Sequence, residues 1–282
     1  MNKSIKIGLV QMRHGKDAQA NFAKAKEGVV KASGAGARAV CLSELFGSLY
    51  FCQKEDPAVR ALAQEIPGPA TDALAAWARE CGTVLIASLY ERVGDKFYNT
   101  AIVLGPDGAL LGKYRKIHIP DDLEHSYGER YYFSDGDLGF PVFRTSWGVI
   151  GVQVCWDQWY PEGARIMAGQ GAQILFYPTA IGFQVGGPAE VNRAEHEAWQ
   201  IIQRSHAIAN NVFVAACNRV GREENLDFWG TSFVADPLGR MVAKGAPDKE
   251  EVVLADCDLD LISEVRHDWP FLACRKTSIH AK

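Results

Sequence analysis

Cys155 lies at the point where a predicted strand ends and a predicted helix begins. The apolar run Val149–Val154 is typical of a buried strand, and Pro161 suits the first turn of the helix after it. Sheet proteins place reactive groups at strand ends, and backbone N–H groups at such a turn favour a thiolate and later an oxyanion. The position therefore indicates either a nucleophilic thiol or a buried structural cysteine, which is the commoner role of an unpaired cysteine.

A nucleophilic thiol needs a base, and a carboxylate is a better candidate here than a histidine. None of the seven histidines lies in a loop that matches Cys155. Glu44 ends an apolar stretch that begins at Val40, and a charge in such a stretch is costly unless it is paired or functional. We expect Glu44 to be either the general base or a salt-bridged acid at a strand end.

Lys116 is the third candidate, in a basic segment that also contains Lys113 and Arg115. A solvated basic run is the ordinary interpretation of such a segment, and we expect it to hold for Lys113 and Arg115. A lysine beside a carboxylate and a thiol would instead stay charged, and it would stabilise both a thiolate and a developing oxyanion. The residues leave both roles open for Lys116.

A faint internal repeat brings the elements that carry these residues into correspondence. Segment 91–94 matches segment 218–221, and it is one of four matching pairs that occur in the same order in both halves of the chain. In this alignment Glu44 corresponds to Thr179. If the halves pack about a pseudo-two-fold axis, the strand ends that carry the candidates converge.

Hydrophobic periodicity predicts the same order of elements in both halves, which we place at about 5–116 and 148–258. Each half is predicted as strand, helix, strand, helix and then several strands, and the second has a long amphipathic helix at about 188–210. Two such halves most simply form an α/β fold of two sheets packed face to face with helices outside. In the first half the predicted strands are 5–10, 39–42, 84–89, 100–104 and 110–114, and the predicted helices are 18–32 and 71–80.

The composition indicates one intracellular globular domain, which we place at 1–282 with a C-terminal tail from about 259 to 282. Of the 282 residues 48% are hydrophobic, and a net charge of -4 gives no reason to expect binding to nucleic acid. No apolar run reaches the length of a membrane span and the first is too short for a signal peptide, so we expect a cytoplasmic location. Seven cysteines without a C-x-x-C pair indicate neither a disulfide framework nor a structural zinc site.

Three segments together resemble the signatures of the nitrilase superfamily of carbon–nitrogen hydrolases. They are Ser43–Phe46, Lys113–Pro120 and Val154–Glu162, and each surrounds one of the three candidates, in the same order along the chain. The resemblance extends from about residue 5 to residue 257. It implies a four-layer αββα sandwich and an enzyme that needs no metal and no cofactor, hydrolyses non-peptide C–N bonds and releases ammonia.

The resemblance also implies a role for each candidate. Glu44 would take the thiol proton and later activate water, Cys155 would attack the carbonyl carbon, and Lys116 would stabilise the oxyanion together with the backbone N–H of Trp156. Glu129 would support the lysine and the substrate. A homodimer or a larger homo-oligomer is implied as well, through the helix that holds Ala164, Ile166, Met167 and Ala168.

Within the superfamily, the chain is similar to the N-carbamoylputrescine amidohydrolases, for example over Phe176–Gly182. This implies an N-carbamoyl amine as substrate, with an ammonium group far from the thiol. Gln184 stands where those enzymes have a glutamate that could bind the ammonium, and Phe183–Gly187 departs from their pattern. A β-ureido acid such as N-carbamoyl-β-alanine and an aliphatic amide stay open as substrates, and a non-catalytic binding scaffold or a glutaminase module stays open as a function.

We expect the substrate pocket to be lined by residues near these motifs. Trp156 and Tyr50 could hold a cation against an aromatic face, and Asp122, Glu124 or Glu190 could supply the missing carboxylate. The predicted substrate-binding residues are Glu129, Trp156, Tyr50, Thr179, Ala180 and Gln184.

Overall fold

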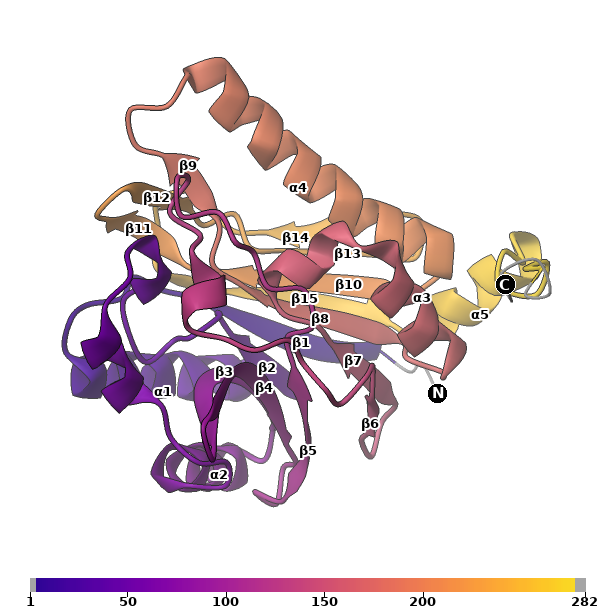
Figure 1. Ribbon diagram of the computed structural model, residues 1–282. Helices are drawn as coiled ribbons and strands as arrows, with labels where there is room; N and C mark the ends of the chain where they lie inside the picture. The colour runs from indigo at the N-terminus through magenta and orange to yellow at the C-terminus, as the bar shows by residue number, and fades with distance from the viewer. Residues whose placement is uncertain (1–3, 277–282) are drawn as a thin grey trace.

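The computed structural model describes residues 4–276, and across them the strands form two six-stranded sheets and a small three-stranded one. The two large sheets lie face to face between two layers of helices (Figure 1). Helices α1 (Ala18–Gly34) and α2 (Pro69–Cys81) cover the first sheet, and α3 (Pro161–Gly169) and α4 (Ala189–Asn210) cover the second. This arrangement confirms the predicted α/β class and the αββα sandwich.

The first sheet has the strand order β15-β1-β2-β3-β4-β5. Its strands are β1 (Ser4–Gln11), β2 (Ala39–Leu42), β3 (Val84–Val93), β4 (Lys96–Leu104), β5 (Leu110–Arg115) and β15 (Glu251–Asp258).

The second sheet has the strand order β14-β13-β10-β8-β7-β6, and the small sheet has the order β11-β12-β9. The strands of the second sheet are β6 (Val142–Arg144), β7 (Val149–Val152), β8 (Ile174–Thr179), β10 (Phe213–Asn218), β13 (Phe233–Ala235) and β14 (Met241–Lys244). Those of the small sheet are β9 (Gly182–Gln184), β11 (Val220–Glu223) and β12 (Leu226–Trp229).

Both large sheets have the same pattern of strand directions. In the first sheet β1, β2 and β3 run parallel, β4 and β5 follow antiparallel, and β15 lies antiparallel beside β1. In the second sheet β7, β8 and β10 run parallel, β13 and β14 follow antiparallel, and β6 lies antiparallel beside β7. On this ground we propose one domain of two related halves, in which β15 crosses from the second half to complete the first sheet.

The side chains of β2 show how one strand is buried on both faces. Cys41 belongs to the apolar cluster that contains the residues between the sheets, whereas Val40 and Leu42 belong to the cluster under α1 and α2. Successive side chains point to opposite faces of a strand, so a strand covered on both sides needs a continuous apolar run. Polar functional side chains are then confined to the strand ends.

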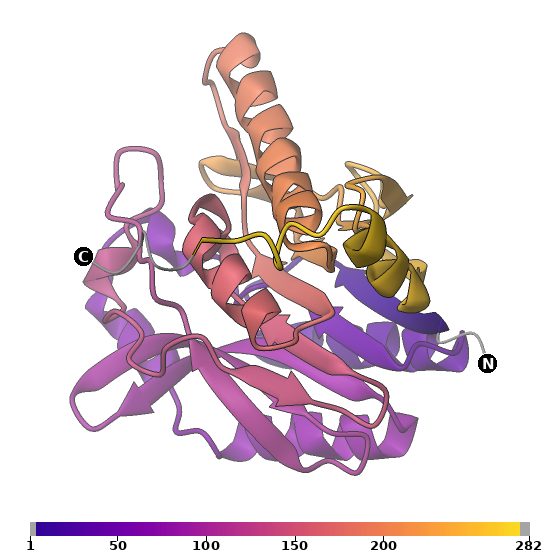
Figure 2. The same ribbon diagram turned by 90° about the vertical axis from the view of Figure 1, so that its right-hand side faces the viewer.

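The helix ends follow local signals in the sequence. The Asp17 carboxylate accepts hydrogen bonds from the backbone N–H groups of Gln19 and Ala20 and so caps α1. Gly82 has a φ of 58° and ends α2 in the left-handed conformation that favours glycine. Figure 2 shows the first turns of α4 extending beyond the sheets.

The prediction was wrong in detail around Cys155. Strand β7 ends at Val152, two residues earlier than predicted, and a short 3₁₀ helix, η4 (Cys155–Trp159), comes before α3. Helix α3 begins only at Pro161. The thiol therefore lies at the start of one tight turn, and its nearest backbone N–H groups belong to that turn.

The remaining helices are short. They are η1 (Phe51–Gln53), η2 (Pro57–Leu62), η3 (Glu129–Tyr131) and α5 (Asp260–Asp268). Helix α5 lies in the predicted C-terminal tail, of which 277–282 fall outside the described residues. Between residues 4 and 276 we find no helix with the length and apolar character that a membrane crossing requires.

A close approach of α1 to β1 gives a test of this packing. A Cβ at Gly28 would lie 2.4 Å from the Cγ1 of Val10, a buried β-branched side chain that cannot turn away freely. We expect Gly28→Ala to lower the free energy of unfolding by about 1–3 kcal/mol through overpacking, although alanine favours helices. The measurement is urea denaturation followed by circular dichroism.

Gly34 at the end of the same helix provides the matched control. Apart from its chain neighbours and the backbone of α1, no atom of the described residues lies within 4 Å of the position a Cβ would take there, so Gly34→Ala should leave stability unchanged or slightly higher. Equal stabilities for the two variants would contradict the close packing of α1 on β1.

Candidate active site

The three candidates and Glu129 meet inside the sandwich. Glu44 follows β2, Lys116 follows β5, Glu129 begins η3 and Cys155 begins η4, and all four side chains are buried. The Lys116 Nζ donates to Glu44 Oε1 at 2.9 Å and to Glu129 Oε2 at 2.6 Å. Segments far apart in the chain thus converge on one buried ammonium group.

The two carboxylate oxygens of Glu44 have different surroundings. Oε1 accepts from Lys116 and from the Asn99 side-chain amide at 2.7 Å, and the Asn99 amide oxygen in turn accepts from Ser88 Oγ at 2.9 Å. Oε2 is buried, and no donor of the described residues bonds to it. A carboxylate held by one oxygen with the other left unbonded has the form that a general base requires.

Burial raises the pKa of the Cys155 thiol well above its usual range. The charge of Glu44 raises this pKa further, while the charge of Lys116 opposes the increase. The thiol hydrogen can bond to the carbonyl oxygen of Ala180, 3.7 Å from Sγ. A raised pKa favours the neutral thiol, which must then lose its proton during the reaction, as expected if Glu44 acts as the base.

Burial opposes the charge on Lys116, but Glu129 and Glu44 outweigh it and raise the pKa of Lys116 well above its usual range. Burial also raises the pKa of Glu129, to about 7, against the attraction of Lys116. Two ionised carboxylates beside one ammonium leave an excess negative charge in a place without solvent. A proton gained by Glu129 relieves this excess most easily, because its pKa is raised.

Asp157, which the sequence analysis did not single out, holds the turn that carries the thiol. Its buried carboxylate accepts from the backbone N–H of Val154 at 3.0 Å and from the Tyr114 hydroxyl at 2.8 Å. It also accepts from the backbone N–H of His118 at 3.0 Å. Cys155 itself has a φ of 44°, an unusual conformation for a residue with a side chain, and these bonds on both sides hold the backbone there.

The neighbouring basic residues were expected in solvent, and this was wrong for Arg115. Its guanidinium is buried and bonds to Glu91 Oε2 at 2.8 Å and to Asp137 Oδ1 at 2.7 Å. Lys113 is half-buried and forms an ion pair with the same Glu91. The basic segment is thus an internal charge cluster, since β5 turns these side chains towards the buried Glu91 on β3.

Tyr50, Thr179 and Ala180 belong to the frame around the triad. The Tyr50 hydroxyl donates to Glu129 Oε1 at 2.7 Å. The carbonyl oxygen of Thr179 accepts from the backbone N–H of Glu44 at 3.4 Å, so the two positions paired by the repeat meet in space. Their surroundings indicate positioning of the triad, and these residues do not line the cavity described next.

A cavity of about 290 Å³ lies beside the Cys155 turn. Its wall includes Trp156 and Ile181, which follow Cys155 and Ala180 in the chain, and it also includes the predicted Gln184. The acidic residues and the histidine among the described ones that line it are Asp122, Glu195 and His125. Asp122 was one of the carboxylates proposed from the sequence, whereas Glu124 and Glu190 lie outside this lining.

Glu195 was missed because nothing in its surroundings along α4 distinguishes it from other exposed acids. It is exposed on that helix and lines the cavity, and the pKa of His125 is raised mainly by Asp122 and more weakly by Glu124 and Glu195. The Gln184 side-chain amide donates to the carbonyl oxygen of His125 at 2.6 Å. In the part of the chain that the structure describes, no group of three or more His, Cys, Asp or Glu is arranged to hold a metal ion.

Comparisons with known proteins agree with this geometry. Residues 6–267 match the Carbon-nitrogen hydrolase family. The chain is 38% identical to the N-carbamoylputrescine amidase of Solanum lycopersicum, over 99% of this chain and 94% of that protein. It is 36% identical to the citrullinase of Francisella tularensis, over 98% and 97% of the two chains.

Among solved structures, the carbon–nitrogen hydrolase from Helicobacter pylori superposes with a TM-score of 0.92 at 40% identity, over 98% of this chain and 97% of that one. Fold, length and sequence similarity thus agree over nearly the whole chain. The protein belongs to the carbon–nitrogen hydrolases of the nitrilase superfamily and acts on non-peptide amides.

Proposed function

We propose that the enzyme hydrolyses an N-carbamoyl amine, with N-carbamoylputrescine as the first candidate. The observation that carries this proposal is the charge of the cavity beside Cys155. Of its described lining residues, two are carboxylates, Asp122 and Glu195, one is a histidine, and none is a lysine or an arginine. An acidic far wall attracts an ammonium group and repels a carboxylate.

Within this lining, Glu195 is the better partner for the ammonium group. The Asp122 carboxylate bonds to the His125 ring at 2.8 Å, so part of its charge is already compensated. Gln184 is neutral: its amide N–H donates to the His125 carbonyl, and its amide oxygen attracts a cation more weakly than a carboxylate does. Trp156 adds an aromatic face in the same wall, which favours a cation by a cation–π contact.

The reaction follows from the buried groups. Glu44 takes the thiol proton through its unbonded oxygen, and Cys155 attacks the carbonyl carbon of the substrate. Lys116 and the backbone N–H of Trp156 stabilise the tetrahedral oxyanion. Glu44 returns the proton to the departing amino group, which leaves as ammonia, and a thioester-type carbamoyl group, a thiocarbamate, stays on Cys155.

Water completes the cycle. Glu44 removes a proton from a water molecule, which attacks the thioester and releases the thiol and an N-alkyl carbamate. The carbamate takes up a proton and loses carbon dioxide to give the free amine. The products are then putrescine, carbon dioxide and ammonia.

Other substrates differ in what they present to the far wall. A β-ureido acid would bring a carboxylate towards Asp122 and Glu195, and an aliphatic amide would bring no charge. A citrulline-like substrate or glutamine, as for a glutaminase, would bring a carboxylate together with its ammonium. The acidic lining disfavours the carboxylates, and this supports the carbamoyl amine over these alternatives.

We also propose that the protein forms a homodimer or a larger homo-oligomer. Most of the residues first assigned to its interface, however, pack inside the chain. Ala164, Met167 and Ala168 of α3 are buried within the chain, and only Ile166 of that set is exposed. Ile166 and the exposed Phe271 line a hollow of about 550 Å³ between α3, α4 and the C-terminal tail. We propose this apolar surface as the contact between copies.

Cys155→Ala should abolish ammonia release, because it removes the proposed nucleophile. With wild-type enzyme and a slow substrate, intact-protein mass spectrometry should show a covalent adduct. The exposed Cys274 supplies the control: Cys274→Ala should keep both turnover and adduct. An adduct that persists in Cys155→Ala would place the nucleophile elsewhere.

Glu44→Gln keeps the shape of the side chain and removes the base. We expect kcat to fall by about 10²–10⁴-fold, the usual contribution of general acid–base catalysis, and Lys116→Ala to fall comparably through the oxyanion. The exposed Glu27 on α1 offers a neutral comparison as Glu27→Gln. Full kcat in either active-site variant would show that its residue is structural.

The substrate proposal is tested with three ureas whose far end carries a cation, no charge or a carboxylate. We expect kcat/KM to be higher for N-carbamoylputrescine than for N-butylurea, its uncharged counterpart, and lowest for N-carbamoyl-β-alanine. Glu195→Gln should raise KM for N-carbamoylputrescine about two- to fivefold, as expected for one partly exposed ion pair, and leave N-butylurea unchanged.

Glu190 in the first turn of the same helix is the matched control, because it lies outside the cavity lining. Glu190→Gln should change neither KM. If N-carbamoyl-β-alanine were the best of the three substrates, the assignment of an amine substrate would be wrong.

A further inference from the structure

A buried arginine from the second half of the chain reaches the backbone that carries Glu44. Arg219 lies between β10 and β11, and its side chain is 0% exposed. Its counter-ion is Glu223, whose Oε1 lies 2.9 Å from the Arg219 Nη1. A buried guanidinium is costly unless its charge is balanced and most of its N–H groups are bonded, so its other partners are informative. Among the described residues the Arg219 Nε has no partner, and its bonds run through Nη1 and Nη2.

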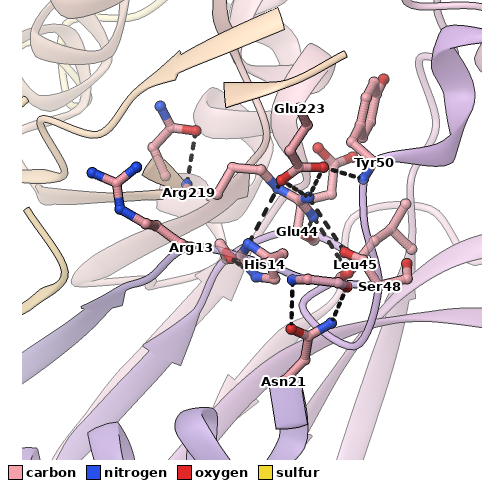
Figure 3. Close-up of polar contacts among 12 residues, drawn as sticks. Arg13, His14, Asn21, Glu44, Leu45, Ser48, Tyr50, Arg219 and Glu223 are labelled. Atoms are coloured by element: carbon pink, nitrogen blue, oxygen red, sulfur yellow. Dashed lines mark hydrogen bonds and ion pairs between the residues drawn. The ribbon is translucent and has the colours of Figure 1, made fainter. Parts of the chain in front are cut away.

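The guanidinium donates to three carbonyl oxygens of the loop that follows β2. Nη2 donates to the carbonyl of Glu44 at 2.6 Å and to that of Leu45 at 3.3 Å, and Nη1 donates to that of Ser48 at 3.4 Å (Figure 3). Leu45 has a φ of 48°, which is unfavourable for a residue with a side chain. The bonds from Arg219 hold the backbone in this conformation at the residue next to Glu44.

Glu223 extends the same contact to the other end of the loop. Its Oε2 accepts from the backbone N–H of Tyr50 at 2.6 Å, and the Tyr50 hydroxyl donates to Glu129 (Figure 3). The Arg219–Glu223 pair therefore fixes both ends of the loop 44–50. One end carries the carboxylate proposed as base, and the other supports the carboxylate that holds Lys116.

His14 is the other titratable group beside this pair. Its Nδ1 lies 3.9 Å from Glu223 Oε1, beyond hydrogen-bond distance, and Nε2 lies 3.3 Å from Ser43 Oγ. Burial lowers the pKa of His14 well below its usual range, and the charge of Arg219 lowers it further. A neutral imidazole leaves the Glu223 carboxylate as the group that balances Arg219.

The internal repeat supplies a comparison within the same chain. The matching segments 91–94 and 218–221 pair Arg219 with Arg92. The Arg92 side chain is 52% exposed, and among the described residues its one ion pair is a 3.9 Å contact with Glu65. The arginine at this position of the repeat is therefore not buried in both halves. It is buried in the second half, where it faces the Glu44 loop.

We propose that Arg219 is a positioning residue for the general base: through the carbonyl oxygens of the Glu44 loop it aims the Glu44 carboxylate at the thiol. The proposal rests on the role of Glu44 as base in the proposed function. A lysine can retain the charge, but it lacks the planar group of donors that reaches several carbonyls at once. Arg219→Lys is therefore the informative variant, with Arg219→Met as the complete removal.

We expect kcat of Arg219→Lys to fall about 10- to 100-fold with KM changed less than about twofold, because a small misplacement of a reacting group costs this much. Rates are divided by the folded fraction, measured by circular dichroism and size-exclusion chromatography. Arg92→Met is the matched control and should keep kcat. An unchanged kcat per folded Arg219→Lys enzyme would overturn the proposal.

The effect must also depend on Glu44. In the Glu44→Gln background, Arg219→Lys should lower the residual kcat by less than about twofold, because there is no carboxylate left to aim. An equal loss in both backgrounds would mean that Arg219 supports the fold in general and would overturn the proposal.

The single variants separate this inference from the proposed function. Full activity of Glu44→Gln would overturn the base assignment and the inference with it. A large loss in Glu44→Gln together with unchanged kcat in Arg219→Lys would overturn the inference alone.

Discussion

The fold is organised around one buried ammonium group held by two carboxylates. Removing the Lys116 charge from water costs several kcal/mol, and only close partners in a fixed geometry offset that cost. Glu44 and Glu129 supply them at 2.9 Å and 2.6 Å. The negative charges of the two carboxylates raise the pKa of the Cys155 thiol, and the ammonium group lowers it. The position of the ammonium group therefore affects the protonation of each of these groups.

This constraint explains why the site needs both sheets. Glu44 and Lys116 come from the first sheet, and Cys155 comes from the second. The backbone contact from Glu44 to Thr179 joins the two at corresponding strand ends. Strand β15 adds a second link, since it ends the second half of the chain and pairs with β1 of the first. Relative movement of the sheets would separate nucleophile from base.

Much of the fold could be predicted from the sequence because it depends on local pattern. Apolar runs predicted the buried strands, hydrophobic periodicity predicted α4, and Gly82 marked the end of α2. The turn after Cys155 could not be predicted in this way. Pro161 correctly marks the start of an α-helix, but the 3₁₀ turn before it depends on Asp157 bonding to Val154 and Tyr114, and Tyr114 lies on another sheet.

The candidate site shows the same division between local and distant information. Glu44, Lys116 and Cys155 were identifiable because each lies in its own short motif. Asn99 and Arg219 have no such motif, since their bonds to the Glu44 segment join positions 55 and 175 residues apart. Arg115 was misassigned for a related reason: whether a basic residue faces solvent depends on Glu91, which lies on a different strand.

Substrate choice is the hardest feature to predict, and the reason is physical. The chemistry requires a few groups at fixed distances in a buried place, and such groups lie in short motifs that can be recognised in the sequence. The far end of the cavity is partly exposed, so a carboxylate there can come from the loop that contains Asp122, from the position of Gln184 or from α4 with equal effect on the fold. The family pattern pointed to position 184 for this carboxylate, which is Gln184 here. The carboxylate that lines the cavity from α4 is Glu195. Because ionic attraction depends on where the charge lies in space, different positions in the chain can serve the same ligand.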